Sequence, residues 1–280
     1  MPDARPPHAR LPAALAPFVV TLAGYELGGG AAGVHRGLPS STVSITIPEA
    51  DSLEIGWIGG PGPRERLRAV VAGLHLGAAE LRQQRSTCGV WLTLSPSGAR
   101  ALLGLPASAL AGSVADLAEA VPALADLPER LAARRSWPER RALVERALLA
   151  GLARHGERAA RHDLRATLAA LSGTARVQEA ARRLGCSRRH LSGTVRGELG
   201  VTPKEYQRLV RFERARGRLV AAAREGVGLA AVAAASGFAD QAHLTREWRA
   251  MAGCTPTEWL RAEGPAPHAR PAGERPPGGE

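Results

Sequence analysis

One pattern of residues occurs twice near the C-terminal end of the chain, and it restricts the possible folds more than any other feature. The segment HLSGTVRGELGVTPKEY (190–206) aligns without a gap with HLTREWRAMAGCTPTEW (243–259), at a constant offset of 53 residues. Both copies keep a His-Leu pair, a glycine, a Thr-Pro pair and a glutamate in the same places. A repeat of this kind indicates two copies of one supersecondary unit.

Each copy has the features of a helix-turn-helix motif. In the first copy, a short helix is expected to end at Gly185 and a second helix to start at a Ser187 cap. In the second copy, Gly237 marks the turn and Asp240 is the expected cap. Apolar residues at three- and four-residue spacing predict one buried face on each second helix. These residues are Leu191, Val195 and Leu199 in the first copy and Leu244, Trp248 and Met251 in the second.

Both copies end in the sequence Thr-Pro-x-Glu, which is typical of a capping box with proline at the first helical position. The helix that follows the first box is predicted from Pro203 to about Ala222, and it is long enough to join the two motifs. Its expected core contacts are Tyr206, Leu209, Val210 and Leu219. The arginines of this helix that are expected to approach phosphates are Arg208, Arg211, Arg214, Arg216 and Arg218.

The formal net charge of +11 is concentrated in the same part of the chain. Residues 151–262 contain 20 Lys and Arg against 10 Asp and Glu, whereas residues 1–150 contain 15 against 13. This asymmetry favours a polyanionic partner such as nucleic acid. On charge alone, a helical bundle with a solvated arginine face is an equal alternative, but the two capped motifs favour double-stranded DNA. The polar residues on the outer faces of the second helices, which are the candidates for DNA contact, are Arg188, Arg189, Ser192, Arg196, Gln241, Thr245, Arg246 and Arg249.

Residues from about 162 to 262 resemble the DNA-binding domain of the AraC/XylS family of bacterial transcriptional regulators. The family pattern reads GF-x-D-x-x-H/F-x-x-R-x-F/W followed by G-x-T-P. The residues that match it here are Gly237, Phe238, Asp240, His243, Arg246, Trp248, Gly253, Thr255 and Pro256. In the first copy, Gly193 stands where the family commonly has arginine. The resemblance implies a sequence-specific regulator that places two recognition helices in successive major grooves, and whose other domain senses a ligand, dimerises, or both.

The first half of the chain is rich in predicted strands and then becomes helical. Short β-branched or alternating runs between Gly and Pro clusters predict strands within 17–27, 41–50, 52–60, 68–77 and 87–96, and leucine spacing predicts helices from about residue 96. The expected fold class is therefore α+β, with a strand-rich domain followed by an all-α tandem helix-turn-helix domain. The resemblance implies that the strand-rich domain is a cupin-like sensor or dimerisation domain. The expected boundaries are 1–150 for this domain, 151–161 for a linker, 162–262 for the DNA-binding domain and 263–280 for a disordered tail.

Within the strand-rich domain, His35, Arg36 and His75 are the candidates for lining an effector pocket. Neither a metal nor a cofactor is expected. The three cysteines, Cys88, Cys186 and Cys254, are far apart and show no metal-ligand spacing, so they are interpreted as reduced thiols.

Three further observations bear on the class of protein. The segment GGGAAG (28–33) matches G-x-G-x-x-G, but no helix pattern follows it, so a loop is predicted rather than a dinucleotide site. No apolar run reaches 18 residues, so a cytoplasmic protein without a membrane partner is expected. A regulator of this kind has a small-molecule effector, a second copy of itself and RNA polymerase as candidate partners.

Two other classes of function remain alternatives. One is an enzyme that acts on a nucleotide or other small molecule and is targeted by its C-terminal domain, although the sequence shows neither a paired acid and base nor a nucleophile with its base. The other is an interaction protein that does not bind DNA. The two capped motifs and the local positive charge disfavour the second alternative.

Overall fold

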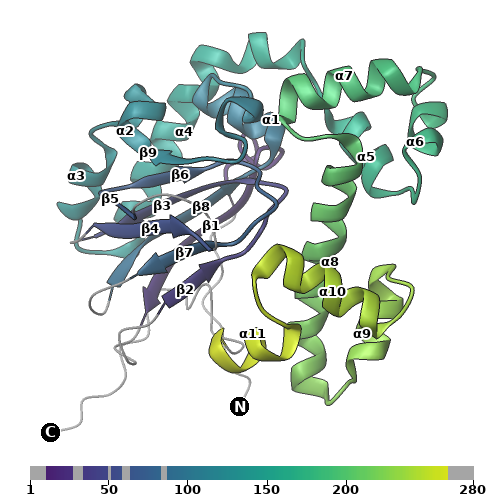
Figure 1. Ribbon diagram of the computed structural model, residues 1–280. Coiled ribbons are helices and arrows are strands. Elements are labelled where there is room, and N and C mark those ends of the chain that lie inside the picture. Colours follow the sequence, from purple (N-terminus) through teal and green to yellow (C-terminus); the bar gives the residue numbers. More distant parts are fainter. Residues whose placement is uncertain (1–10, 28–33, 50–51, 59–63, 83–86, 264–280) are drawn as a thin grey trace, which may run out of the picture.

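The computed structural model describes residues 11–27, 34–49, 52–58, 64–82 and 87–263. Two antiparallel sheets form the N-terminal region, and a set of helices wrapped around one long helix forms the C-terminal region (Figure 1). The expected α+β fold is therefore confirmed. The predicted tail beyond residue 263 and the glycine-rich segment 28–33 lie outside the described residues.

The described strands belong to a five-stranded sheet with the order β1-β8-β3-β6-β9 and a four-stranded sheet with the order β2-β7-β4-β5. Every described pairing is antiparallel. The strands are β1 (Val19–Leu27), β2 (Val34–Gly37), β3 (Val43–Pro48), β4 (Leu53–Trp57), β5 (Glu65–Leu67), β6 (Val70–Ala72), β7 (Ala79–Arg82), β8 (Thr87–Leu94) and β9 (Val114–Asp116). The five strands expected from the sequence are present as β1, β3, β4, β6 and β8, whereas the shorter β2, β5, β7 and β9 were not predicted.

Strand β3 shows why the two sheets enclose a space. Its apolar residues Val43, Ile45 and Ile47 are buried in the main core, and the alternate residues Ser44 and Thr46 point to the opposite face. This opposite face is turned toward the second sheet, because Ser44 and Thr46 line a cavity together with residues of β4 and β7. The alternation of the sequence therefore sets an apolar side toward the helices and a hydroxyl-bearing side toward the cavity.

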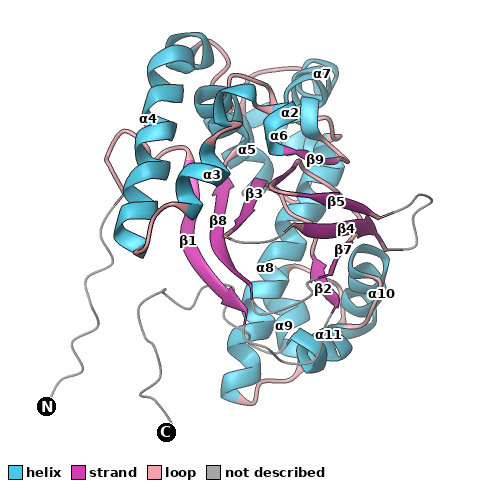
Figure 2. Cartoon of the chain, turned by 90° about the vertical axis from the view of Figure 1, so that its left-hand side faces the viewer, coloured by secondary structure: helices cyan, strands magenta, loops and turns pink. Residues whose placement is uncertain are grey.

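Short helices and one long helix cover the other face of the first sheet. Figure 2 shows α3 and α4 beside β1 and β8. These helical elements are α1 (Pro96–Gly98), η1 (Ala99–Leu103), η2 (Ala107–Leu110), α2 (Leu117–Ala120), η3 (Pro122–Leu124), α3 (Leu127–Ala132) and α4 (Trp137–Ala160). Helix α4 begins at a capping box formed by Ser136 and Glu139, and Gly151 lets it approach the backbone of Leu102. Because α4 continues to Ala160, the segment 151–161 that was expected as a linker is almost entirely helical.

The C-terminal region contains α5 (Arg165–Ser172), α6 (Val177–Arg183), α7 (Arg188–Leu199), α8 (Pro203–Glu225), α9 (Leu229–Ser236), α10 (Gln241–Ala252) and α11 (Pro256–Glu263). Helix α8 forms the axis of this region, with α5 to α7 around its first half and α9 to α11 around its second (Figure 1). Buried apolar residues of both regions, from Leu94 in β8 to Trp248 in α10, belong to one continuous cluster. None of the described helices is long and apolar enough to cross a membrane.

Candidate DNA interface and effector cavity

The first helix-turn-helix motif consists of α6 and α7, and its turn has the predicted geometry. Gly185 has a φ of +65°, a conformation that favours glycine, and it lies between the two helices. The Ser187 hydroxyl accepts a hydrogen bond of 3.1 Å from the backbone N–H of His190 and so caps α7. The predicted stripe of Leu191, Val195 and Leu199 is buried. The sequence-based interpretation of this motif is therefore confirmed.

The second motif consists of α9 and α10 and repeats the plan with aromatic packing. The Asp240 carboxylate accepts a hydrogen bond of 2.6 Å from the N–H of His243 at the start of α10. Trp248 is fully buried, and its ring centroid lies 4.7 Å from that of Phe212 in α8 and 5.6 Å from that of Trp259 in α11. Leu244, Trp248 and Met251 form the predicted buried stripe. Tilted contacts of the Trp248 ring with the rings of Phe212 and Trp259 therefore hold α10 to α8 and α11.

Both Thr-Pro-x-Glu boxes are also formed. Thr202 accepts from the N–H of Glu205 while the Glu205 carboxylate accepts from the N–H of Thr202 at 2.7 Å, and Thr255 and Glu258 make the same pair of bonds. These hydrogen bonds lower the pKa of the Glu258 carboxyl. The boxes fix where α8 and α11 start, and therefore how each motif continues into its next helix.

The recognition helices α7 and α10 carry the candidate DNA contacts on their open faces. The five arginines among them are exposed, and they form no hydrogen bond or ion pair with any described residue. These arginines are Arg188, Arg189, Arg196, Arg246 and Arg249. Gln241 is exposed, Ser192 and Thr245 are half-buried, and the Thr245 hydroxyl donates to the carbonyl of Gln241 at 2.9 Å. The geometry thus leaves the candidate cations available to an anionic partner.

Four of the five arginines of α8 that were expected to approach phosphates make contacts within the protein or line its cavity, and their contact with phosphates stays a prediction. Arg208 forms an ion pair of 2.7 Å with Glu247 of α10, and Arg211 lies 5.6 Å over the ring of Phe238. Arg214 donates to the carbonyl of Ser172 in α5, and Arg216 lines the cavity described below. The sequence could not separate these roles, because each partner lies far away along the chain.

Polar contacts of α8 hold both motifs at set positions. Gln207 is buried, and its side-chain amide donates to the carbonyls of Leu171 (3.2 Å) and Thr174 (2.9 Å), next to the first motif. Arg208 and Arg211 make the contacts with the second motif given above. Helix α8 thus fixes the separation and orientation of α7 and α10.

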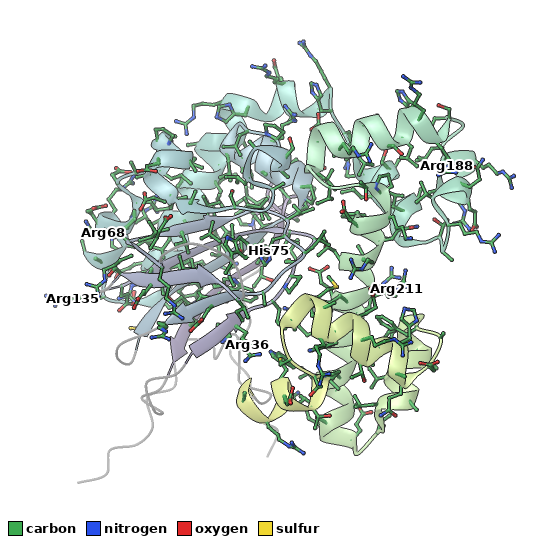
Figure 3. The ribbon with its side chains drawn as sticks, viewed as in Figure 1. Arg36, Arg68, His75, Arg135, Arg188 and Arg211 are labelled. Atoms are coloured by element: carbon green, nitrogen blue, oxygen red, sulfur yellow. The ribbon has the colours of Figure 1, made fainter. Side chains whose placement is uncertain are left out.

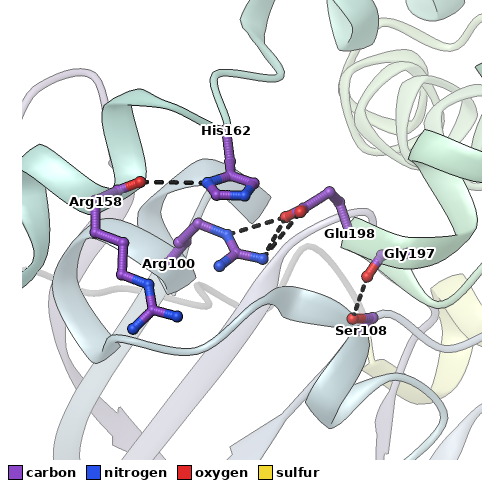
Figure 4. Close-up of polar contacts among 6 residues, drawn as sticks. All are labelled: Arg100, Ser108, Arg158, His162, Gly197 and Glu198. Atoms are coloured by element: carbon purple, nitrogen blue, oxygen red, sulfur yellow. Dashed lines mark hydrogen bonds and ion pairs between the residues drawn. The ribbon is translucent and has the colours of Figure 1, made fainter.

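The last turn of α7 is attached to the N-terminal region, and Figure 4 shows this contact. Arg100 donates to both oxygens of the Glu198 carboxylate, at 2.8 to 3.0 Å, and the Ser108 hydroxyl donates to the carbonyl of Gly197 at 2.7 Å. Gly200 follows with a φ of +75°, and a Cβ there would collide with Ala111. Sequence reasoning missed these contacts, since neither Arg100 nor Glu198 belongs to a recognisable motif.

Helix α8 is attached to the N-terminal region by a carboxylate. Glu213 accepts hydrogen bonds from the Ser40 hydroxyl (2.9 Å), the Ser41 backbone N–H (2.9 Å) and the Ser41 hydroxyl (2.5 Å). These serines precede β3, and Ser40 and Glu213 line the cavity between the two sheets. Part of the cavity lining therefore comes from α8, the axis of the C-terminal region.

A cavity of about 240 Å³ lies between the sheets, and α8 forms part of its wall. It brings together the predicted pocket residues His35, Arg36 and His75 with Glu213 and Arg216, which sequence reasoning had not assigned to a pocket. Figure 3 shows His75 among the strands and Arg36 at the edge of the sheets that faces the second motif. The side-chain hydroxyls in the lining of the cavity come from Thr21, Ser40, Thr42, Ser44, Thr46 and Thr93, and apolar side chains in the lining come from Ile55, Val70, Leu81 and Val114.

Three titratable groups of the cavity lining have shifted pKa values, and burial is the main cause in each: it raises the pKa of Tyr25 and lowers those of His75 and Arg216. His75 is buried, its Nδ1 lies 2.6 Å from the carbonyl of Gly77, and its ring stacks edge-on against Trp57 at 5.2 Å. Burial lowers the pKa of His75, so the neutral ring donates from Nδ1 to this carbonyl. Burial also lowers the pKa of the Arg216 guanidinium, against the opposing effect of the Glu213 charge. A half-buried guanidinium favours an anionic group nearby.

Among the described residues, no three His, Cys, Asp or Glu side chains lie close enough together to hold a metal ion. Cys88 and Cys186 are half-buried and Cys254 is buried, and none of the three forms a disulfide bond. The Cys88 thiol donates to the Glu49 carboxylate at 3.0 Å. The cysteines therefore have separate environments.

Comparison with known proteins agrees with the geometry of the C-terminal region. Residues 180–262 match the family described as a helix-turn-helix domain, which is of the AraC type. No curated protein matches the chain.

Several solved structures of ToxT from Vibrio cholerae are similar to the chain. A variant of apo ToxT from strain SCE256 has 12% identity and a TM-score of 0.50 over 86% of this chain and 96% of that chain. ToxT from strain O395 has 12% identity and a TM-score of 0.49, over 88% and 98% of the two chains. A ToxT structure described as bound to an unsaturated fatty acid has 11% identity and a TM-score of 0.49, over 88% and 95%. At these identities the likeness concerns the fold. The C-terminal part of the chain therefore contains a helix-turn-helix domain of the AraC type.

Proposed function

We propose that the protein regulates transcription by placing α7 and α10 in successive major grooves on one side of an operator. The observation that carries this proposal is the pair of capped motifs on one continuous helix, α8. Its Gln207 side chain donates to carbonyls beside the first motif, and its Arg208 side chain pairs with Glu247 of the second. Two recognition helices held in this way suit sites about one helical turn, or roughly 34 Å, apart on B-DNA. The exposed arginines supply the charge needed for the phosphates.

Within each recognition helix we assign the side chains to two roles. Gln241 and Arg246 are proposed to contact base edges, because the amide of glutamine and the guanidinium of arginine can each make two hydrogen bonds to one base. Arg188 and Arg189 at the start of α7, and Arg196 and Arg249 near the ends of the two helices, are proposed to bind phosphates or bases. Ser192 and Thr245 complete the two faces.

We further propose that a small organic molecule in the cavity between the sheets controls DNA binding. The cavity is lined by hydroxyl groups, apolar side chains and the guanidinium of Arg216. This lining suits a small molecule whose acidic group pairs with the guanidinium. Arg216 and Glu213 belong to α8, so a ligand that contacts them acts directly on the helix that positions both motifs. A second copy of the chain and RNA polymerase are proposed as further partners, in the cytoplasm.

The DNA-binding part of the proposal is tested by selecting sites from random duplex DNA with the full chain and measuring affinity over a salt series. We expect an enriched site, and Arg246→Ala should weaken binding to it by roughly 1 to 3 kcal/mol while non-specific binding is largely retained. Arg135→Ala removes the same charge on the side of the molecule away from α10 and is the matched control (Figure 3). Specific binding that survives Arg246→Ala would show that the assigned reading face is wrong.

The effector part is tested by native mass spectrometry of the full chain purified from cells. Thr46→Phe adds bulk inside the cavity, and Leu149→Phe adds similar bulk at an exposed position of α4. We expect a small molecule to be retained by the parent protein and by Leu149→Phe and to be lost from Thr46→Phe, with unfolding temperature as the check on folding. Equal retention by both variants, or none by the parent protein, would contradict an effector in this cavity.

A further inference from the structure

The two recognition helices are equivalent in position but differ at the residue in the middle of the open face. Gly193 of α7 and Arg246 of α10 occupy the same place in the repeat, 53 residues apart. Both positions are exposed, and both lie one turn or more past the cap of their helix. Arg246 therefore projects a guanidinium where α7 projects no side chain.

No local requirement of the fold explains a glycine at this position. Gly193 has a helical backbone and does not belong to the positive-φ glycines. A Cβ at residue 193 would have no atom within 4 Å outside its own helix, and the same is true of Gly197 one turn later. Glycine inside an exposed helix lowers helix stability relative to alanine. Packing therefore does not explain Gly193. The missing side chain instead affects a partner that contacts the open face of α7.

The remaining open face of α7 is better suited to anchoring than to reading. Its first turn has two adjacent arginines, Arg188 and Arg189, where α10 has Gln241 and an alanine. Arginines at a helix start can bind phosphates in any sequence, whereas a glutamine and an arginine five residues apart, as in α10, can each select a base through paired hydrogen bonds. The two residues of α10 proposed to contact base edges, Gln241 and Arg246, are replaced in α7 by Arg188 and Gly193.

We infer that Gly193 is a specificity-determining residue: it leaves α7 with weak base discrimination, so that most of the sequence information of the operator lies opposite α10. This inference rests on the proposed function. It implies an asymmetric operator, with one well-defined element and one element in which many sequences are accepted.

The test uses the full chain and DNA sites selected from random duplex, with affinity measured for every single-base change. For the parent protein, we expect changes in one element to weaken binding by about 10- to 100-fold each and changes in the other by less than about 3-fold. Gly193→Arg should create a preferred base in the weak element, with a penalty of about 10-fold for the wrong base. Arg246→Gly should remove the preference in the strong element.

Gly193→Ala is the matched control, because it restores a helix-forming residue without adding a donor. It should leave the base preferences of both elements unchanged. If Gly193→Arg fails to fold, as judged by circular dichroism, Arg246→Gly still shows whether the well-defined element is the one that α10 reads, and loss of preference in the other element would contradict the inference.

Two equally constrained elements in the parent protein, or an unchanged weak element in a folded Gly193→Arg, would overturn the inference while leaving the proposed function intact. Failure to enrich any site would instead overturn the sequence-specific function, and the inference with it.

Discussion

The two helix-turn-helix motifs share one plan but are stabilised by different surroundings. The second motif is held by the buried rings of Trp248, Phe212 and Trp259, whereas the stripe of the first motif consists of two leucines and a valine. The first motif is attached to the N-terminal region by a bidentate ion pair between Arg100 and Glu198. The comparison teaches that the repeated sequence specifies the local motif, and that the residues around it decide whether a motif is a self-sufficient unit or part of a larger assembly.

The attachments also determine which part of the C-terminal region can respond to the cavity. The hydrogen bonds of Glu213 with Ser40 and Ser41, and the position of Arg216 in the cavity wall, connect α8 to the sheets. The Arg100 ion pair connects α7 to the same region. Arg100 does not line the cavity, whereas Glu213 and Arg216 do, so a change in the cavity would reach both motifs through α8.

The largest expected effect concerns the aromatic packing of the second motif. Trp248→Ala removes a fully buried indole from contact with two other rings and should lower the free energy of unfolding by about 3 to 5 kcal/mol. Val195→Ala at the equivalent position of the first motif removes far less volume and should cost less. Chemical denaturation measures both losses when it is followed by far-ultraviolet circular dichroism, because this signal reports helix content and does not depend on Trp248. Equal losses would show that the aromatic cluster is not what distinguishes the motifs.

An intermediate effect is expected from the two ion pairs that reach the motifs. The side chains of Arg100 and Glu198 are each 16% exposed, whereas those of Arg208 and Glu247 are 31% and 28% exposed. A double-mutant cycle with alanine should give a coupling free energy of about 1 to 2 kcal/mol for the Arg100–Glu198 pair and under about 1 kcal/mol for the other. A larger coupling for Arg208 and Glu247 would reverse the comparison, and the second motif would then depend on charge more than the first.

The smallest expected effect concerns the helix caps. Ser187→Ala and Asp240→Ala each remove one hydrogen bond to a backbone N–H at the start of a recognition helix, and each should cost about 1 kcal/mol. The Asp240 carboxylate also interacts with the positive end of the helix dipole. The free energy of unfolding lost in Asp240→Ala should therefore be smaller at high salt, whereas that lost in Ser187→Ala should not change. Thermal unfolding at two ionic strengths tests this difference, and equal salt dependence would argue against it.

Features that depend on short stretches of sequence were predictable. The caps Ser187 and Asp240, both Thr-Pro-x-Glu boxes and the buried stripes are confirmed, because each depends on residues within a few positions of one another. Val210 was expected in the core and is only partly buried against it. The strands β2, β5, β7 and β9, of three or four residues each, were missed, whereas the equally short β6 was predicted because it lies in the longer apolar run RAVVAGLHLG.

Features that depend on contacts between distant segments were not predictable. Glu213 meets Ser40 and Ser41 more than 170 residues away, and no sequence pattern relates them. The arginines of α8 have similar sequence contexts but face a carboxylate, an aromatic ring, a carbonyl or a cavity. His35, Arg36 and His75 could be proposed as pocket residues from their positions near strands, and the structure places all three at one cavity. Their role in binding an effector stays a prediction, as do the domain boundaries and the base contacts.

Protection of guanine N7 from methylation in the major groove, measured with the full chain on its selected site, tests the central claim most directly. Reading by α7 and α10 together predicts two groups of protected guanines centred about 10 base pairs apart, which places both on one face of the duplex. Protection of a single group, or of two groups about half a turn apart on opposite faces, would contradict a rigid pair of recognition helices held by α8.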